Sequence, residues 1–140
     1  MATVSVKWLE KRQFVGIDAT KHSVVMSSHD EQNGVGMSPS QLLLVALGGC
    51  TSYDVVDILE KKRQRVTGLH VTVTGEQDDQ PPWPYRRIHV HYALSGPGLK
   101  EKAVRDAIEL SQQKYCSVAA TCRGAAEITH DFTINDEDGG

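Results

Sequence analysis

Hydrophobic and polar residues alternate in three short runs at the start of the chain. The runs are TVSVKW, QFVGID and HSVVMS, and they end at Ser27. Alternation with a period of two is typical of strands, and it places Val4, Val6 and Trp8 on one face of the first run. A polar, glycine-containing stretch over residues 27–40 follows and is predicted to be a loop. The N-terminal part is therefore predicted to consist of strands.

The pattern then changes to that of a long helix. Ser38 is a favoured N-cap, Pro39 suits the first helical position, and Gln41 completes an S-x-x-Q capping box. The helix is predicted to run to about Gln64. Its first half is apolar almost all round, which argues for burial on every side. Its second half is amphipathic, with Val55, Val56, Ile58 and Leu59 predicted inward and Asp54, Asp57, Glu60 and Lys61 toward solvent.

Alternation returns in GLHVTVTGE and RRIHVHYALSG, which are predicted to be strands joined by a polar, proline-rich loop. The run LKEKAVRDAIELSQQKY predicts a second amphipathic helix, and a short third helix is expected from Ser117 to about Arg123. AEITHDFTI is the last predicted strand, with Ala126, Ile128, His130, Phe132 and Ile134 on one face. The apolar stripe of the second helix consists of Val104, Ala107, Ile108, Ser111 and Tyr115.

This order predicts an α+β fold with a mostly antiparallel sheet. We expect a single domain over residues 1–135 and a disordered tail over 136–140. A lone sheet can cover only one side of the first helix. A second subunit is therefore a natural way to bury the remainder of its apolar start.

Composition narrows the class of protein. The 140 residues carry a formal net charge of −3, and no basic stretch is long enough for a nucleic-acid footprint. The basic run Glu60–Arg65 is interpreted as a solvated helix end. The apolar run LLLVAL is shorter than the ~20 residues of a membrane span, and no secretion signal is seen. We expect a cytoplasmic protein without membrane or nucleic-acid partners, in which thiols stay reduced.

Three cysteines are the main candidates for chemistry. Cys50 follows Gly48 and Gly49 in the middle of the first helix, where it could either pack or react. Cys116 precedes the short third helix, and a thiol at a helix N-terminus has its pKa lowered from about 8.5 toward ~3.5–7.5. Cys122 lies within that short helix and is predicted to fill space.

Metal and hydrolase chemistry have weaker support. His89 and His91 form an H-x-H pair on one strand face, but Arg87 shares that face and no Cys or Asp lies at a matching spacing. An exposed polar face is the preferred interpretation, and His130 is predicted to be a core histidine. No G-x-S-x-G motif supports Ser-His-Asp catalysis. We predict no metal and no cofactor.

Two motifs resemble the OsmC/Ohr family of organic-hydroperoxide-handling proteins. They are SPSQLLLVALGGCTSYDVVDIL and, 66 residues after its cysteine, KYCSVA, and together with EITHDF they look most like the YhfA-like branch. The resemblance implies an OsmC-like fold and an intertwined homodimer with long helices at its centre. It also implies that Cys50 attacks a peroxide and that Cys116 resolves the sulfenic acid as a disulfide.

The sequence departs from the family pattern upstream of Cys50. The peroxidases carry a Glu ten residues before the attacking cysteine, paired with an Arg from the N-terminal strand region. Here Ser40 holds that position, with Gln41 beside it, and Arg12 is the available Arg. If Arg12 faced Cys50, it would stabilise the thiolate without the carboxylate that orients it.

Three functional hypotheses follow. The first is a thiol-dependent peroxidase that reduces small organic hydroperoxides through a Cys50/Cys116 dithiol–disulfide cycle and takes electrons from a thiol reductant. The second is a redox-sensing or apolar-ligand-binding protein on the same fold, without efficient turnover. The third leaves both cysteines buried and unreactive. The peroxidase ranks first.

Overall fold

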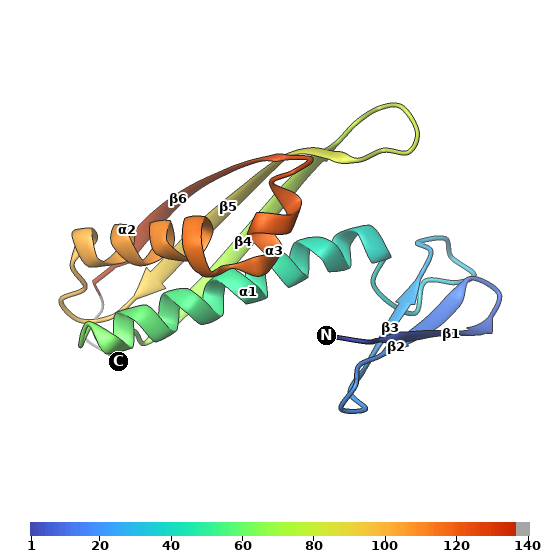
Figure 1. Cartoon of the computed structure of the whole chain (residues 1–140), viewed down its shortest axis with the longest axis horizontal. Coiled ribbons are helices and arrows are strands. Elements are labelled where there is room, and N and C mark those ends of the chain that lie inside the picture. The colour runs from blue at the N-terminus through green and yellow to red at the C-terminus, as the bar shows by residue number, and fades with distance from the viewer. Residues whose placement is uncertain (137–140) are drawn as a thin grey trace. The chain divides into compact units, whose positions relative to one another are not determined.

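The fold is α+β, as predicted, and was obtained as a computed structural model that describes residues 1–136 (Figure 1). Its contacts divide the chain into two compact units, Met1–Leu43 and Leu44–Gly140. The single domain expected over residues 1–135 stays a prediction. Of the tail predicted at 136–140, residues 137–140 lie outside the described part. Asp136 accepts a hydrogen bond of 2.8 Å from the backbone N–H of Gly98.

The first unit contains a three-stranded antiparallel sheet in the order β1-β2-β3. The strands are β1 Ser5–Glu10, β2 Gln13–Ile17 and β3 Ser23–Ser27, each within two residues of its predicted start. All six residues of β1 are exposed, including Val6 and Trp8. This unit therefore leaves an apolar strand face open to solvent.

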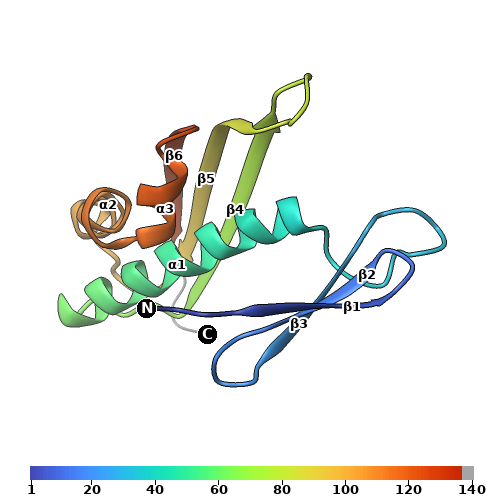
Figure 2. The same cartoon turned by 45° about the vertical axis from the view of Figure 1, so that its right-hand side comes forward.

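The second unit contains a sheet in the order β4-β5-β6, formed by β4 Gly68–Gln77, β5 Tyr85–Ser95 and β6 Glu127–Asn135. The β4–β5 pair is antiparallel, whereas β5 and β6 run parallel. Parallel neighbours need a crossover, and the helices between β5 and β6 supply it. Three helices lie on the same face of this sheet (Figures 1 and 2).

Helix α1 spans Pro39–Lys61 and begins as the sequence predicts. The Ser38 hydroxyl accepts the N–H of Gln41 at 3.3 Å, which satisfies one of the free donors of the first turn. Within the second unit one face of α1 is buried, rather than every side. Its buried residues are Leu47, Gly48, Thr51, Val55 and Leu59.

The two glycines of α1 differ in their surroundings. A Cβ placed on Gly48 would lie 3.1 Å from a methyl group of Val73 on β4, so this glycine allows a close helix–sheet approach. A Cβ on Gly49 would meet no described atom within 4 Å. Of the two glycines, Gly48 is therefore the one that allows a close approach within the second unit.

By length and composition alone, α1 could cross a membrane. This is weak evidence, because core helices of soluble proteins pass the same test. The buried face of α1 contacts β4 and β5 here, as Gly48 and Thr51 illustrate.

The second helical region begins as predicted and then changes its winding. Helix α2 spans Glu101–Leu110 and continues as a π-helical turn, η1, over Ser111–Tyr115, before α3 at Ser117–Cys122. Val104, Ala107, Ile108 and Ser111 are buried, as predicted. Tyr115 is 54% exposed, so its assignment to the apolar stripe was wrong. The wider π turn changes the phase of the helix just before that residue.

Candidate functional site

The helices of the second unit bring two of the three cysteines and a carboxylate together. The Sγ atoms of Cys50 and Cys116 and a carboxylate oxygen of Asp54 all lie within 4.8 Å of one another. Cys50 and Asp54 are one helical turn apart on α1, whereas Cys116 lies between η1 and α3. All three cysteines are free thiols. Residues 66 positions apart in the sequence thus share one site.

The two thiols of this site differ in accessibility. Cys50 is half-buried, and Cys116 is only 3% exposed and belongs to the hydrophobic core. A small molecule arriving from solvent can therefore reach Cys50 more readily than Cys116.

Cys116 is the N-cap of α3, as the sequence predicts. Its Sγ accepts the backbone N–H of Ala119 at 3.4 Å. The expected lowering of its pKa is nevertheless wrong. Burial, with a further contribution from the hydrogen bond to Cys50, raises the pKa of the Cys116 thiol to about 11. Loss of hydration of the thiolate outweighs the helix N–H groups that favour it.

Asp54 is the site residue that the sequence pattern misplaced. Predicted to face solvent, it is half-buried and accepts a hydrogen bond of 2.9 Å from the Ser111 hydroxyl. The spacing of four residues from Cys50 could have revealed it, because residues four apart share one helix face. Amphipathicity alone assigned the carboxylate to the wrong environment.

A chain of buried polar groups leads to Asp54. Gln112 Nε2 donates to the Tyr92 hydroxyl at 2.6 Å, which lies 2.6 Å from Thr51 Oγ1. Thr51 Oγ1 is 2.8 Å from the Ser111 hydroxyl, which donates to Asp54. An amide N–H can only donate and an ionised carboxylate can only accept, so each hydroxyl in the chain donates toward Asp54.

No polar group in this hydrogen-bonded chain lacks a partner. Every buried side-chain N and O atom of the described residues has a hydrogen-bond partner. Burial raises the pKa of the Tyr92 phenol, and its hydrogen bonds with Thr51 and Gln112 oppose that rise. Tyr92 thus remains a neutral member of the chain. A fully satisfied buried network of this kind fixes the positions of its members.

The other predicted site neighbours belong to the first unit. Arg12 is exposed in the β1–β2 turn, and its guanidinium donates to the carbonyl of Lys11 at 3.2 Å. Its backbone N–H binds the Asn33 side chain at 2.9 Å. Ser40 and Gln41 are exposed in the first turn of α1. Contact between Arg12 and Cys50 stays a hypothesis.

Cys122 lies outside the site. It is half-buried and packs against the core, and burial raises the pKa of its thiol. Its predicted packing role agrees with this placement.

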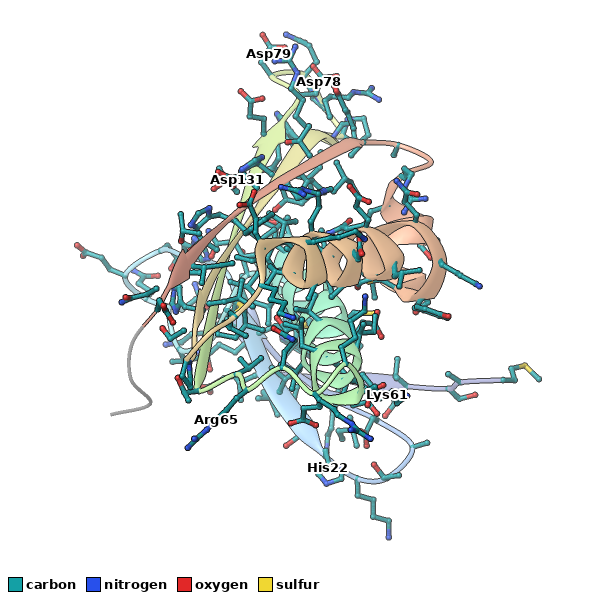
Figure 3. The ribbon with its side chains drawn as sticks, turned by 90° about the vertical axis from the view of Figure 1, so that its left-hand side faces the viewer. His22, Lys61, Arg65, Asp78, Asp79 and Asp131 are labelled. Carbon is teal, nitrogen blue, oxygen red and sulfur yellow. The ribbon has the colours of Figure 1, made fainter. Side chains whose placement is uncertain are left out.

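The histidines of β5 have a partner that sequence spacing could not reveal. Asp131 lies opposite His91 in the parallel β5–β6 register, and one of its carboxylate oxygens is 2.8 Å from a ring nitrogen of each of His89 and His91. These hydrogen bonds lower the pKa of the Asp131 carboxyl. Figure 3 labels Asp131 on β6. The predicted polar face therefore carries a His–Asp–His cluster.

Fold and site together define a small α+β protein with a dithiol–carboxylate cluster in its helical layer. The model of the OsmC-like protein family matches residues 28–131. Protein YhfA of Escherichia coli (strain K12) is 38% identical over 129 residues, which cover 92% of this chain and 95% of YhfA. The chain therefore belongs to the OsmC family, and its similarity to YhfA agrees with the branch that the motifs indicate.

Solved structures agree on the fold. An OsmC-like protein from Mycoplasma pneumoniae has a TM-score of 0.83 and 18% identity, covering 96% of each chain. An organic hydroperoxide resistance protein from Elizabethkingia anophelis has a TM-score of 0.70 and 14% identity, again covering 96% of each chain. The OsmC-like fold predicted from the motifs is confirmed.

Proposed function

We propose that this protein is a thiol-dependent peroxidase that reduces small organic hydroperoxides through a Cys50/Cys116 dithiol–disulfide cycle. The observation that carries the proposal is the proximity of the two sulfurs, which lie within 4.8 Å of each other and of Asp54. A disulfide requires such proximity of its cysteines before oxidation. Family membership supports thiol redox chemistry at this pair.

Different accessibility assigns the two cysteines different roles. Cys50 is half-buried and attacks the peroxide as a thiolate. Its sulfur forms a bond to the terminal oxygen of the peroxide while the O–O bond breaks. The alkoxide that departs takes up a proton and leaves as an alcohol. Cys50 is then a sulfenic acid. The Cys116 sulfur attacks the Cys50 sulfur, and water leaves with the sulfenic hydroxyl and the Cys116 proton. A dithiol reductant of the cell returns the disulfide to two thiols and is itself oxidised.

Ser40 replaces the family's upstream Glu in this chain, and Asp54 supplies a carboxylate beside the two thiols instead. The raised pKa of Cys116 keeps that thiol protonated at neutral pH, so its attack requires a proton acceptor. A carboxylate oxygen of Asp54 lies within 4.8 Å of both sulfurs. We assign Asp54 the transfer of the Cys116 proton toward the departing hydroxyl.

The surroundings of Cys50 favour an apolar substrate. Cys50 packs against a core cluster that includes Leu47 and Ala119. Such walls bind an alkyl group better than they bind hydrogen peroxide, since burial of apolar surface contributes roughly 25 cal/mol per Å². We therefore expect alkyl hydroperoxides to be reduced faster than hydrogen peroxide.

We also propose that the active form is a cytoplasmic homodimer. Large apolar side chains stand exposed on both units: Val6 and Trp8 at 62%, Val45 at 51% and Tyr53 at 74%. Val45 and Tyr53 belong to α1, whose apolar start has only one buried face in a single chain. A second copy would cover these residues. Light scattering that reports a monomer at micromolar concentration contradicts this proposal.

The decisive experiment follows the thiols and the turnover together. The reduced protein is treated with one equivalent of cumene hydroperoxide, alkylated and analysed by mass spectrometry for a Cys50–Cys116 disulfide. Turnover is measured with dithiothreitol. Cys50→Ser should abolish turnover, and Cys116→Ser should accumulate a sulfenic acid that dimedone traps. Cys122→Ser is the matched control and should retain both disulfide and turnover. Undiminished turnover in Cys50→Ser contradicts the proposal.

A second candidate function, binding of an apolar ligand without efficient turnover, has one supporting observation. A groove of 410 Å³ in the first unit is lined mainly by apolar side chains, among them Val6, Ile17 and Met26. Native mass spectrometry of the purified protein tests it. A retained apolar ligand together with thiols that do not react with the hydroperoxide favours this function over the peroxidase.

A further inference from the structure

The cluster of Cys50, Asp54 and Cys116 has the composition and spacing of a metal site. Its three potential ligand atoms lie within 4.8 Å of one another. In a tetrahedral zinc site with Zn–S bonds of about 2.3 Å, the two sulfurs lie about 3.8 Å apart. The three side chains therefore need only a small contraction to share one ion.

We propose that the reduced cluster of Cys50, Asp54 and Cys116 binds a thiophilic divalent ion of the zinc type. Two thiolates and one carboxylate suit a borderline-soft ion, whereas magnesium and calcium prefer oxygen ligands alone. Three protein ligands leave the fourth tetrahedral position for water. Cys50 is only half-buried, so the cluster has one ligand that solvent can reach.

The second layer of contacts supports the ligand set. The Ser111 hydroxyl donates to Oδ2 of Asp54 at 2.9 Å and so orients the carboxylate of the ligand set. The N–H of Ala119 points to the Cys116 sulfur at 3.4 Å and would stabilise a bound thiolate. Groups that hydrogen-bond to the ligands in this way fix ligand orientation and tune metal affinity.

The backbone fixes the three ligands relative to one another. Cys50 and Asp54 are held one turn apart by α1. The Cys116 N–H donates to the carbonyl of Ser111 at 2.8 Å, and the hydroxyl of the same Ser111 binds Asp54. A site on rigid elements requires little ordering when an ion binds.

Metal binding and disulfide formation exclude each other, because both use the same two sulfurs. Binding displaces the two thiol protons and involves no electron transfer, whereas oxidation removes two electrons and forms the S–S bond. The ion would thus protect the reduced pair from peroxide, a consequence that rests on the proposed peroxidase function. Oxidation of the pair by hydroperoxide would release the ion.

The test uses the reduced full-length protein in the absence of oxygen. Cobalt(II) serves as the spectroscopic probe, because bound thiolates give sulfur-to-cobalt charge-transfer bands in the near ultraviolet and a four-coordinate ion gives intense visible bands. We expect one cobalt per chain, displaced by one equivalent of zinc. We also expect zinc to protect two of the three cysteines from alkylation. These two measurements need no variant and do not depend on how a variant folds.

Variants then identify the ligands. Cys50→Ser and Cys116→Ser should each lose about half of the charge-transfer intensity, because each removes one thiolate. Asp54→Asn should lower zinc affinity by at least about tenfold. Cys122→Ser and the double variant His89→Ala/His91→Ala are matched controls and should leave the spectrum unchanged. Circular dichroism checks that each variant is folded.

Three results would overturn the inference. They are a cobalt spectrum without charge-transfer bands, a charge-transfer band that persists in Cys50→Ser/Cys116→Ser, and loss of the spectrum in the double histidine control. Failure of this inference is distinct from failure of the proposed function. If the peroxide forms the disulfide but cobalt gives no thiolate spectrum, only the metal site is refuted. If cobalt binds and the peroxide forms no disulfide, only the peroxidase is refuted.

Discussion

The buried hydroxyl of Tyr92 provides a quantitative test of the polar chain that ends at Asp54. Tyr92→Phe removes this hydroxyl from a residue that is 0% exposed. Two hydrogen bonds of 2.6 Å disappear, one with Thr51 and one with Gln112. Each contributes about 1 kcal/mol net, and the stranded amide of Gln112, which is 5% exposed, adds an unsatisfied donor at about 1–3 kcal/mol. We expect a loss of about 3–5 kcal/mol.

The assay is equilibrium unfolding in urea under reducing conditions. A change in midpoint with an unchanged slope reports stability alone. Tyr115→Phe is the matched control, because Tyr115 is 54% exposed and its change should stay within about 0.5 kcal/mol. A loss below about 0.5 kcal/mol in Tyr92→Phe would refute the assigned network.

A double-mutant cycle tests whether the members of the chain act together. Thr51→Val removes the hydroxyl between Tyr92 and Ser111 at nearly constant volume. The double variant with Tyr92→Phe loses the shared bond only once, so its cost should fall short of the sum by about 1 kcal/mol. Additivity within about 0.3–0.5 kcal/mol shows that the two hydroxyls are independent and contradicts the chain.

Two further predictions concern the glycines of α1 and the dependence of stability on pH. In the same urea assay, Gly49→Ala should be more stable than Gly48→Ala by about 1 kcal/mol. Both variants gain helix propensity, but only the methyl group added at position 48 presses on Val73. Equal unfolding midpoints for the two variants contradict the close approach at Gly48. The folded state raises the pKa of Cys116 from its ordinary 9.0 to about 11 and so holds the thiol proton more tightly than the unfolded state. This contribution is complete below pH 9.0 and is lost as the pH rises toward about 11, so the stability difference between the parent and Cys116→Ala should decrease over that range. A pH-independent difference shows that the burial of Cys116 does not shift its titration.

Much of the fold could be predicted because its signals are local. The strand alternation and the capping pattern at Ser38 need only neighbouring residues, and both are found in the structure. The position of Tyr115 could not be predicted in this way. A regular period of 3.6 places it with Ser111 on the buried face, but the π turn between them breaks that period.

The pairing of the two cysteines in the candidate site could be predicted from the sequence, whereas the pKa of Cys116 could not. The two motifs suggested Cys50 and Cys116 as a pair, and the structure places them together. The helix N-terminus predicted a lowered pKa for Cys116, whereas burial raises it. How deeply a thiol is buried depends on elements distant in sequence. The same reason explains Asp131, whose pairing with His91 requires the parallel register of β5 and β6.

The π turn at Ser111–Tyr115 makes the site depend on the length of the chain as well as on its residues. A π turn accommodates one residue more than an α turn, and each residue of a helix rotates the following ones by about 100°. If this segment wound as a regular α-helix with all its residues kept, the second sulfur would rotate by about 100° away from Cys50. In relatives of this protein, loss of the π turn without a matching one-residue deletion would therefore separate proteins with a paired dithiol from proteins with two isolated thiols, even where both cysteines are retained.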